Sequence, residues 1–236
     1  MKKDMMSPSL MCCDMMHMER DVSALERAGA DMFHYDIMDT TFTTSTMLPP
    51  YMLRQLVNCT KLPLDIHIMS KTPQLYLEQI LPYCRDGYVS VHAESTHEIP
   101  YVISEIRKAG VHPGLALNGY TPLVYVEEMA PYIDMVLLVN VLAGIIGPRP
   151  EIDDVFAARI RRTREILDRA GRKDVLLEVD GNISIRNARI AKRNGANAYV
   201  LGTAGIFKPD IKIEDACAVF RAEIEKEEYY EIADCT

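Results

Sequence analysis

The feature that most constrains the fold of this chain is a regular alternation between short apolar runs and longer amphipathic stretches. Runs of this kind predict strands at residues 5–11, 31–38, 64–69, 87–92, 112–118, 134–140, 174–180 and 198–202. The amphipathic stretches predict helices at residues 14–28, 48–58, 74–84, 98–109, 122–129, 153–170, 184–194 and 213–227. Strands that alternate with helices in this way indicate a parallel sheet, because each helix returns the chain to the same edge.

Several of the predicted strands are nearly continuous apolar runs, which favours burial on both faces. An example is Met135-Val136-Leu137-Leu138-Val139. With 236 residues, 48% of them hydrophobic, the chain is long enough for one large core. We therefore predict a single (β/α)8 TIM barrel over residues 1–236, with an acidic C-terminal tail from about residue 228. A doubly wound open sheet is the alternative, but no strand is followed by Gly-x-Gly-x-x-Gly and a helix.

Composition and charge limit the classes of molecule that the chain is expected to bind. The net charge of −8 argues against nucleic acid, which requires a basic face. No apolar run has the length of a membrane span, and the start of the chain lacks the long apolar segment of a signal peptide. We expect a cytoplasmic protein that binds neither a membrane nor nucleic acid.

The chain has six cysteines, and none of them forms a C-x-x-C pair. Without a secretion signal we interpret them as reduced thiols, most of them buried as small hydrophobic side chains. A catalytic cysteine stays open as a minority alternative. The six are Cys12, Cys13, Cys59, Cys84, Cys217 and Cys235.

Four polar side chains stand at or near the ends of predicted strands: His34, Asp36, His67 and Asp180. The carboxyl ends of barrel strands form the active-site face, and residues two apart on a strand point to the same side. Any one of them alone is more often a hydrogen-bonded core residue. Together, two imidazoles and two carboxylates are a suitable ligand set for a divalent metal, and the carboxylates can also move protons.

Several segments resemble the ribulose-phosphate 3-epimerase family, from about Ser7 to the last predicted helix. They are Ser7-Pro8-Ser9-Leu10-Met11, Phe33-His34-Tyr35-Asp36-Ile37-Met38-Asp39, Leu64-Asp65-Ile66-His67-Ile68-Met69, Glu178-Val179-Asp180-Gly181 and Leu201-Gly202-Thr203-Ala204-Gly205-Ile206-Phe207. The first and last, with Leu115-Ala116-Leu117-Asn118, are most similar to the allulose-6-phosphate 3-epimerase branch. The resemblance implies a barrel of the ribulose-phosphate-binding type and, as partners, a sugar phosphate and further copies of the chain in a homo-oligomer.

The resemblance also implies a mechanism. One divalent ion, Zn2+ by expectation with Mn2+, Fe2+ and Co2+ as alternatives, is held by His34, Asp36, His67 and Asp180. The substrate is a ketose phosphate of the allulose 6-phosphate or ribulose 5-phosphate type. Asp36 and Asp180 lie on opposite faces of C3 and exchange protons with it through an enediolate.

Further positions are implied to contact the substrate. Ser9 corresponds to the family's serine on the first strand, and Met38 and Met69 to two of its pocket methionines. His92, at the end of the fourth predicted strand, is a further candidate for a polar contact to the substrate. The alternative for both methionines is core packing, and for Ser9 and His92 it is a structural hydrogen bond. The remaining expected contacts are loop residues, several of which offer backbone N–H groups to phosphate: Gly144, Gly181, Asn182, Gly202, Thr203 and Ala204.

Two loops depart from the family pattern. The glycine-rich loop after the sixth strand is here Val139-Asn140-Val141-Leu142-Ala143-Gly144-Ile145-Ile146-Gly147-Pro148, and the loop after the second is Asp39-Thr40-Thr41-Phe42-Thr43-Thr44-Ser45-Thr46. Asn182 replaces a glycine. These changes leave three alternatives open: a variant or unphosphorylated sugar, another barrel reaction such as decarboxylation or aldol cleavage, and a non-catalytic sugar-phosphate-binding protein. A Schiff-base aldolase is disfavoured, because no lysine lies within a predicted strand or at its last residue.

Overall fold

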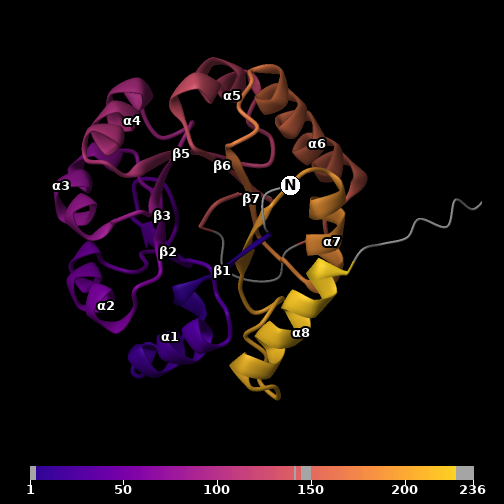
Figure 1. The fold of residues 1–236 in the computed structure, drawn as a ribbon. Helices are drawn as coiled ribbons and strands as arrows, with labels where there is room; N and C mark the ends of the chain where they lie inside the picture. The colour runs from indigo at the N-terminus through magenta and orange to yellow at the C-terminus, as the bar shows by residue number, and fades with distance from the viewer. Residues whose placement is uncertain (1–3, 141, 145–149, 227–236) are drawn as a thin grey trace, which may run out of the picture.

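The computed structural model describes residues 4–140, 142–144 and 150–226. In this part of the chain, parallel strands alternate with helices, and the helices form a ring around the strands (Figure 1). The strands are β1 (Met5–Pro8), β2 (Phe33–Met38), β3 (Leu64–Met69), β4 (Tyr88–His92), β5 (His112–Leu117), β6 (Met135–Val139), β7 (Leu176–Asp180) and β8 (Ala198–Leu201). The helices are α1 (Met18–Arg27), α2 (Leu53–Cys59), α3 (Leu77–Ile80), α4 (Ile99–Lys108), α5 (Val124–Met129), α6 (Asp154–Arg169), α7 (Ile185–Arg193) and α8 (Ile213–Glu225).

The sheet curves into a nearly closed barrel. Its strand order is β1-β8-β7-β6-β5-β4-β3-β2, and every neighbouring pair is parallel. An isolated parallel bridge between Ser9 and His34 joins the two ends of this order. The prediction of a (β/α)8 barrel is therefore confirmed.

Successive side chains of each strand point alternately out of and into the barrel, and so form two layers of packing. On β2, Phe33, Tyr35 and Ile37 belong to the large core between strands and helices, and each is at most 1% exposed. The intervening residues point into the barrel. Burial of a large apolar side chain contributes about 1.5–3 kcal/mol to folding. The outward face of β2 thus stabilises the barrel, which leaves the inward face for polar residues.

The first strand is shorter than predicted. After Ser9 the chain turns into a 3-10 helix, η1 (Leu10–Cys12), rather than continuing as a strand to residue 11. The next helix also begins later than predicted, at Met18 rather than at residue 14. Asp14 instead closes a local turn, in which its side chain accepts the backbone N–H of Met16.

The predicted helix over residues 74–84 is broken into η3 (Pro73–Leu75), α3 and η4 (Leu81–Tyr83). Pro82 lies within this stretch, and a proline removes one helical hydrogen bond and clashes with the preceding turn. The stretch over residues 48–58 is divided in the same way, into η2 (Pro50–Met52) and α2. The apolar spacing predicted these segments, but prolines limit how much of each is α-helical.

The predicted helix ends are confirmed at the glycines. Gly29, Gly110, Gly171 and Gly195 all have positive φ, between 75° and 101°.

Five cysteines, all except Cys235, are described, and each is a free thiol. Among the described residues no helix has the length and apolar character needed to cross a membrane. The predicted acidic tail lies outside the described residues, as do residues 141 and 145–149.

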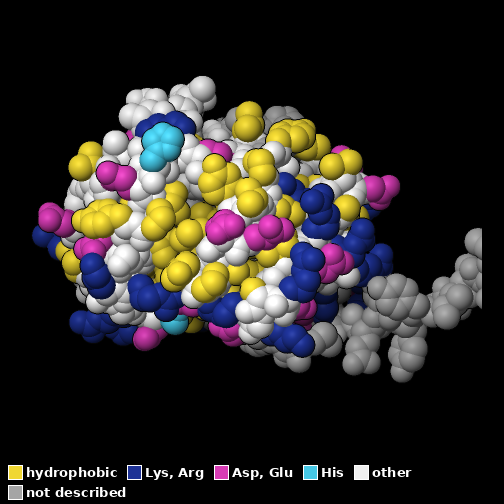
Figure 2. Space-filling model, turned by 90° about the horizontal axis from the view of Figure 1, so that it is seen from above, with side chains coloured by type: hydrophobic (Ala, Val, Ile, Leu, Met, Phe, Trp, Pro, Cys, Tyr) yellow, Lys and Arg dark blue, Asp and Glu magenta, His cyan; other side chains and the backbone are white. Residues whose placement is uncertain are grey.

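The outer surface near α5 is partly apolar. Figure 2, viewed from the side that lies at the top of Figure 1, shows hydrophobic side chains gathered near the middle of this face. Exposed apolar side chains of α5 and its neighbourhood are Tyr120, Val124, Tyr125 and Tyr132. No site residue predicted from the sequence belongs to this group.

Candidate active site

The register between β2 and β3 places two pairs of polar residues side by side. His34 lies opposite Asp65, and Asp36 lies opposite His67. All four are buried, with exposures of 0–3%. The two pairs lie two residues apart along their strands, so all four side chains point to the same side. The two strands together therefore supply four polar side chains to one end of the barrel.

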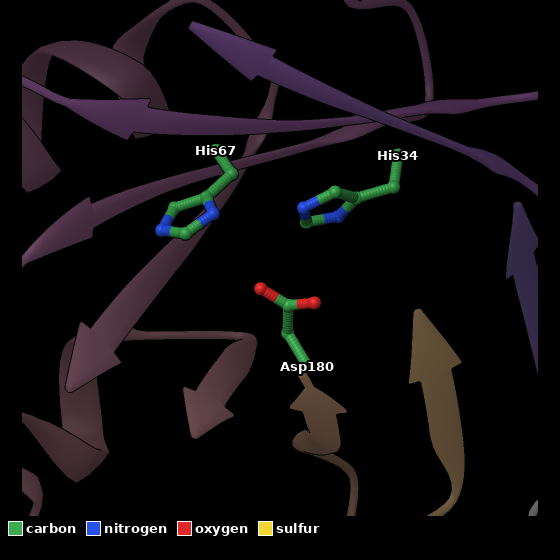
Figure 3. A group of neighbouring side chains, drawn as sticks. All are labelled: His34, His67 and Asp180. Carbon is green, nitrogen blue, oxygen red and sulfur yellow. The ribbon is translucent and has the colours of Figure 1, made fainter. Parts of the chain in front are cut away.

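Strand β7 supplies Asp180 from another part of the wall. Figure 3 shows the His34 and His67 imidazoles and the Asp180 carboxylate turned toward a common space. One ligand atom from each of these three lies within 4.8 Å of the others. Asp36 belongs to the same group, because its Oδ1 is 3.1 Å from His34 Nε2 and 3.3 Å from His67 Nδ1. The structure thus brings together the four residues singled out in the sequence.

His34 is held at Nδ1, the ring nitrogen turned away from the shared space. Its Nδ1 lies 2.5 Å from Asp65 Oδ2, which leaves Nε2 toward the shared space. Burial alone lowers the pKa of His34, but Asp36 and Asp65 outweigh it and hold the pKa well above the ordinary value. The negative potential that attracts a proton here also attracts a metal cation.

Asp36 is an ionised acceptor. Its Oδ2 accepts a hydrogen bond from Ser9 Oγ at 2.9 Å. Burial raises the pKa of Asp36, yet the neighbouring imidazoles, His34 foremost and then His67, outweigh that effect and hold its pKa below the ordinary range. Ser9 therefore contacts the carboxylate directly.

His67 presents one satisfied and one unsatisfied nitrogen. Its Nε2 lies 2.8 Å from His92 Nε2. Its Nδ1 is buried and has no hydrogen-bond partner among the described residues, since its 3.3 Å approach to Asp36 lacks hydrogen-bond geometry. A buried ring nitrogen without a partner is unfavourable, so Nδ1 is suited to an additional ligand.

His92 and Glu94 form the next layer. His92 Nδ1 is 2.9 Å from Glu94 Oε2, and burial lowers the pKa of His92 to about 4. Burial raises the pKa of Glu94, but hydrogen bonds from His92, Thr121 and the backbone of Asn118 bring it to about 2. At neutral pH a neutral imidazole therefore faces a carboxylate.

The methionines expected in the pocket lie in a small apolar cluster inside the barrel. Met38 and Met69 are opposite each other in the β2–β3 register and are 6% and 1% exposed. The partly buried Phe42, from the loop after β2, packs against this cluster, and its ring centroid lies 4.7 Å from that of His92. The Thr-rich loop thus extends the apolar lining up to the histidines.

The loops expected to contact phosphate differ in how they are held. Gly181 has φ of 100°, and Asn182, with φ of 56°, lies in the left-handed region that asparagine tolerates. The Asn182 side chain donates a hydrogen bond to Pro150 O at 3.1 Å. The replacement of glycine by Asn182 therefore preserves the turn and adds a contact to the residues after β6.

The turn after β8 is closed by its own backbone. Gly202 O accepts the N–H groups of Gly205, Ile206 and Phe207, and Thr203 and Ala204 lie within this turn. In the loop after β6, Gly144 approaches Thr43 so closely that a Cβ at residue 144 would lie 2.3 Å from Thr43 Cγ2. The described part of this loop is residues 142–144.

Two residues of this site were given no role in the sequence analysis: Asp65 and Glu94. Asp65 belongs to the segment Leu64–Met69, two residues before His67, and Glu94 follows the fourth strand, two residues after His92. The period of two that identified Asp36 beside His34 applies equally to Asp65, and this signal could have found it.

A (β/α)8 barrel with buried imidazoles and carboxylates at its strand ends places the chain in the class of barrel enzymes. Residues 5–207 match the sequence profile of the ribulose-phosphate 3-epimerase family, and the chain belongs to this family of isomerases. Similar relatives are the ribulose-phosphate 3-epimerases of Bacillus subtilis (32% identity, covering 87% of this chain and 94% of the relative) and Serratia marcescens (31%, 90% and 100%).

Solved structures of lower identity share the fold. The tryptophan synthase alpha-subunit of Pyrococcus furiosus superposes with a TM-score of 0.66 at 14% identity, over 95% of this chain and 98% of the other. Orotidine 5'-phosphate decarboxylase of Pyrococcus horikoshii gives 0.67 at 13% identity, over 94% and 100%. At these identities the likeness concerns the barrel alone.

Proposed function

We propose that the protein is a divalent-metal-dependent 3-epimerase of a ketose phosphate. The observation that carries the proposal is a group of two buried imidazoles and two carboxylates, the buried Asp36 and the partly buried Asp180, which come from different strands of the barrel wall. The donor set fits a metal ion, and the unpaired Nδ1 of His67 supports the fit. His34, Asp36, His67 and Asp180 would hold the ion.

The reaction needs a proton to leave a carbon beside a carbonyl group. A bound divalent cation supplies stabilisation for the negative charge that develops on the substrate oxygens. Asp36 and Asp180 act on opposite faces of C3: one removes the proton, and the other returns a proton from the far side and inverts the centre. Which of them is the base depends on the direction of reaction.

The names of the relatives and the sequence of the loops support a sugar phosphate as the substrate. The relatives are named ribulose-phosphate 3-epimerases, whereas the segments at Ser7–Met11, 115–118 and 201–207 favour an allulose 6-phosphate type of substrate. Backbone N–H groups near Gly181 and in the turn at Thr203 and Ala204 are suited to the phosphate. Met38 and Met69, with Phe42 packed against their cluster, are suited to exclude water from one side of the substrate.

An unphosphorylated or variant sugar is the second candidate. The observation that favours it is the altered loop after β6, in which Ala143 N–H is already bonded to Asn118 Oδ1 at 2.7 Å and so is not free for phosphate. A non-catalytic binding protein is less well supported, because binding alone requires no pair of carboxylates on two sides of one carbon.

The test is exchange at C3. The metal-loaded protein is incubated in D2O with ketose 5-phosphates, ketose 6-phosphates and the free ketoses, and deuterium at C3 is followed by NMR. We expect exchange with one or more phosphorylated ketoses. Exchange with free ketoses alone would select the second candidate, and no exchange with any compound would contradict epimerase activity.

Asp36→Asn and Asp180→Asn test the proton-transfer roles. An amide cannot accept the proton from carbon, so each variant should lose exchange by about 10²-fold or more. Metal content is measured in parallel, because both residues are also proposed ligands. Near-normal exchange in either variant would remove that residue from proton transfer.

A further inference from the structure

We propose that Glu94, acting through His92, is a positioning residue that keeps the proton of His67 on Nε2 and so leaves Nδ1 free for a metal ion. The proposal rests on the function proposed above, because it concerns one of the proposed metal ligands. It is carried by a continuous chain of contacts from the carboxylate of Glu94 to the unpaired nitrogen of His67.

The first step is the contact between the two imidazoles. His67 Nε2 and His92 Nε2 are 2.8 Å apart, and both side chains are fully buried. At this distance one nitrogen donates a proton and the other accepts it, because two lone pairs or two N–H groups would repel each other. The contact allows either direction on its own.

Glu94 determines which of the two imidazoles donates this hydrogen bond. Its Oε2 lies 2.9 Å from His92 Nδ1, and a carboxylate only accepts hydrogen bonds. The proton of a neutral His92 is therefore on Nδ1, and its Nε2 is an acceptor. His67 must then carry its own proton on Nε2, which follows from the hydrogen-bond network rather than from observed hydrogens.

The second step is the other nitrogen of His67. With the proton on Nε2, Nδ1 carries a lone pair, and this is the buried atom without a hydrogen-bond partner among residues 4–140, 142–144 and 150–226. It lies 3.3 Å from Asp36 Oδ1, and the His67 ring faces the space shared with His34 and Asp180 (Figure 3). The lone pair is thus directed where the proposed ligands meet.

The third step is that Glu94 is itself fixed. Its Oε1 accepts the backbone N–H of Asn118 at 2.9 Å and the hydroxyl of Thr121. Arg159 reaches from α6 to the carbonyl oxygens of Asn118 and Thr121, and the Phe42 ring covers His92. A metal-binding histidine often donates its second N–H to a carboxylate. Here a second imidazole is inserted between the two.

Glu94→Gln tests the direction of this chain of hydrogen bonds. If the amide oxygen keeps the contacts to Asn118 and Thr121, the amide N–H₂ faces His92 Nδ1. His92 then carries its proton on Nε2, His67 carries its own on Nδ1, and the lone pair needed by the metal is lost. The opposite orientation is disfavoured, because it would turn the amide N–H₂ toward the backbone N–H of Asn118.

The measurements are Zn2+ affinity by chelator competition and the tautomer of His67 by 15N NMR of the metal-free protein. In Glu94→Gln we expect about 10- to 100-fold weaker Zn2+ binding, together with a shift of the His67 proton toward Nδ1. His92→Phe keeps a ring but removes both nitrogens, and it should weaken Zn2+ binding to a similar extent. Unchanged affinity and tautomer in Glu94→Gln would overturn the proposal; if that variant fails to fold, unchanged affinity in His92→Phe would do so.

Thr121→Val is the matched control. It removes one contact to Glu94 Oε1 but leaves the carboxylate and its contact to His92, so affinity should stay within about threefold of wild type. A loss equal to that of Glu94→Gln would mean that packing, not the proton arrangement, controls the site, and would overturn the proposal.

His67→Ala separates this proposal from the proposed function. Undiminished Zn2+ binding in His67→Ala would contradict the metal site itself. Loss of Zn2+ in His67→Ala with wild-type binding in Glu94→Gln would contradict only the role of Glu94. Loss in both, with retention in Thr121→Val, supports the proposal.

Discussion

At the scale of single residues, the two imidazoles of the site are held in the same manner by different partners. His34 is fixed at Nδ1 by the Asp65 carboxylate, and His67 is fixed at Nε2 by His92. Each ring therefore has one nitrogen left for the shared space. Deeper in the barrel, burial and the charge of Asp65 raise the pKa of Glu178 well above the ordinary value, which favours the neutral form of its carboxyl group.

Cys12 lies near these residues, and its ionisation decides whether it can be a nucleophile. Burial, followed by the negative charge of Asp36, raises the pKa of Cys12 to about 11. A catalytic cysteine requires the opposite shift, since the thiolate is the reactive form. We predict that Cys12→Ser keeps C3 exchange within about threefold of wild type, as for other replacements that remove no essential contact.

The measurement for Cys12 is the D2O exchange assay, with Asp36→Asn as the inactive reference. Reaction of Cys12 with iodoacetamide at neutral pH should also be slower than that of a free cysteine. Loss of exchange in Cys12→Ser at full metal content would restore the alternative of a catalytic cysteine.

At the scale of elements, the loops after β2 and β6 are in direct contact. Thr43 cannot turn away from Gly144, because its Oγ1 donates to Ser45 O at 2.6 Å and its branched side chain has few rotamers. A methyl group at residue 144 would overlap Thr43, with 2.3 Å to Cγ2. The two loops in which the chain departs from the family pattern thus fit each other.

Gly144→Ala tests this contact, and Gly171→Ala is its control. Both glycines have φ of 75°, and only at Gly144 would a new Cβ meet a described atom within 4 Å. Each variant loses about 1–2 kcal/mol from the left-handed backbone, and Gly144→Ala should lose roughly 1–3 kcal/mol more from overlap. Urea unfolding measures the difference. Equal losses would show that Thr43 moves aside at no cost.

The elements also show what a sequence can predict. β3 was predicted with its observed bounds, because its apolar run is sharply limited by polar residues and Pro63. The apolar spacing of residues 74–84 predicts one helix, but Pro82 interrupts it and the stretch divides into η3, α3 and η4. The gathering of His34, Asp36, His67 and Asp180 was predictable from strand ends, since any parallel barrel collects them on one face.

The order of hydrogen bonds around the site was not predictable in this way. Glu94 acts on His67 only through the position of His92 and through contacts from Asn118 and Thr121, which follow the next strand. Such contacts depend on side-chain rotamers and on the loop after β5. Neither is encoded in the local period of the sequence.

At the scale of the whole molecule, the proposed ligands connect distant parts of the barrel. His34 and Asp36 lie on β2, His67 lies on β3, and Asp180 lies on β7, which is separated from β2 by four strands in the sheet order. The site also adjoins the junction of β1 and β2, where the Ser9–His34 bridge and the Ser9–Asp36 hydrogen bond connect the two strands. A bound cation would therefore link strands that the backbone ladder leaves apart.

This arrangement predicts that metal binding stabilises the fold. A ligand that binds only the folded state adds about 4 kcal/mol when it is present at a thousand times its Kd. For a chain of this size, that free energy corresponds to a rise in Tm of roughly 10 °C. We expect such a rise when the EDTA-treated protein is reloaded with Zn2+ and unfolding is followed by calorimetry.

His67→Ala is the control for the thermal prediction, because it removes one ligand and should reduce the rise in Tm to a small fraction. Zn2+ also binds the thiols and imidazoles of an unfolded chain, which lowers the apparent gain. Mn2+ has less affinity for thiolates and therefore provides a second measurement with less of this effect. If wild type and His67→Ala gain equally with both ions, the stabilising metal lies elsewhere, and the linkage of β2, β3 and β7 through a metal is wrong.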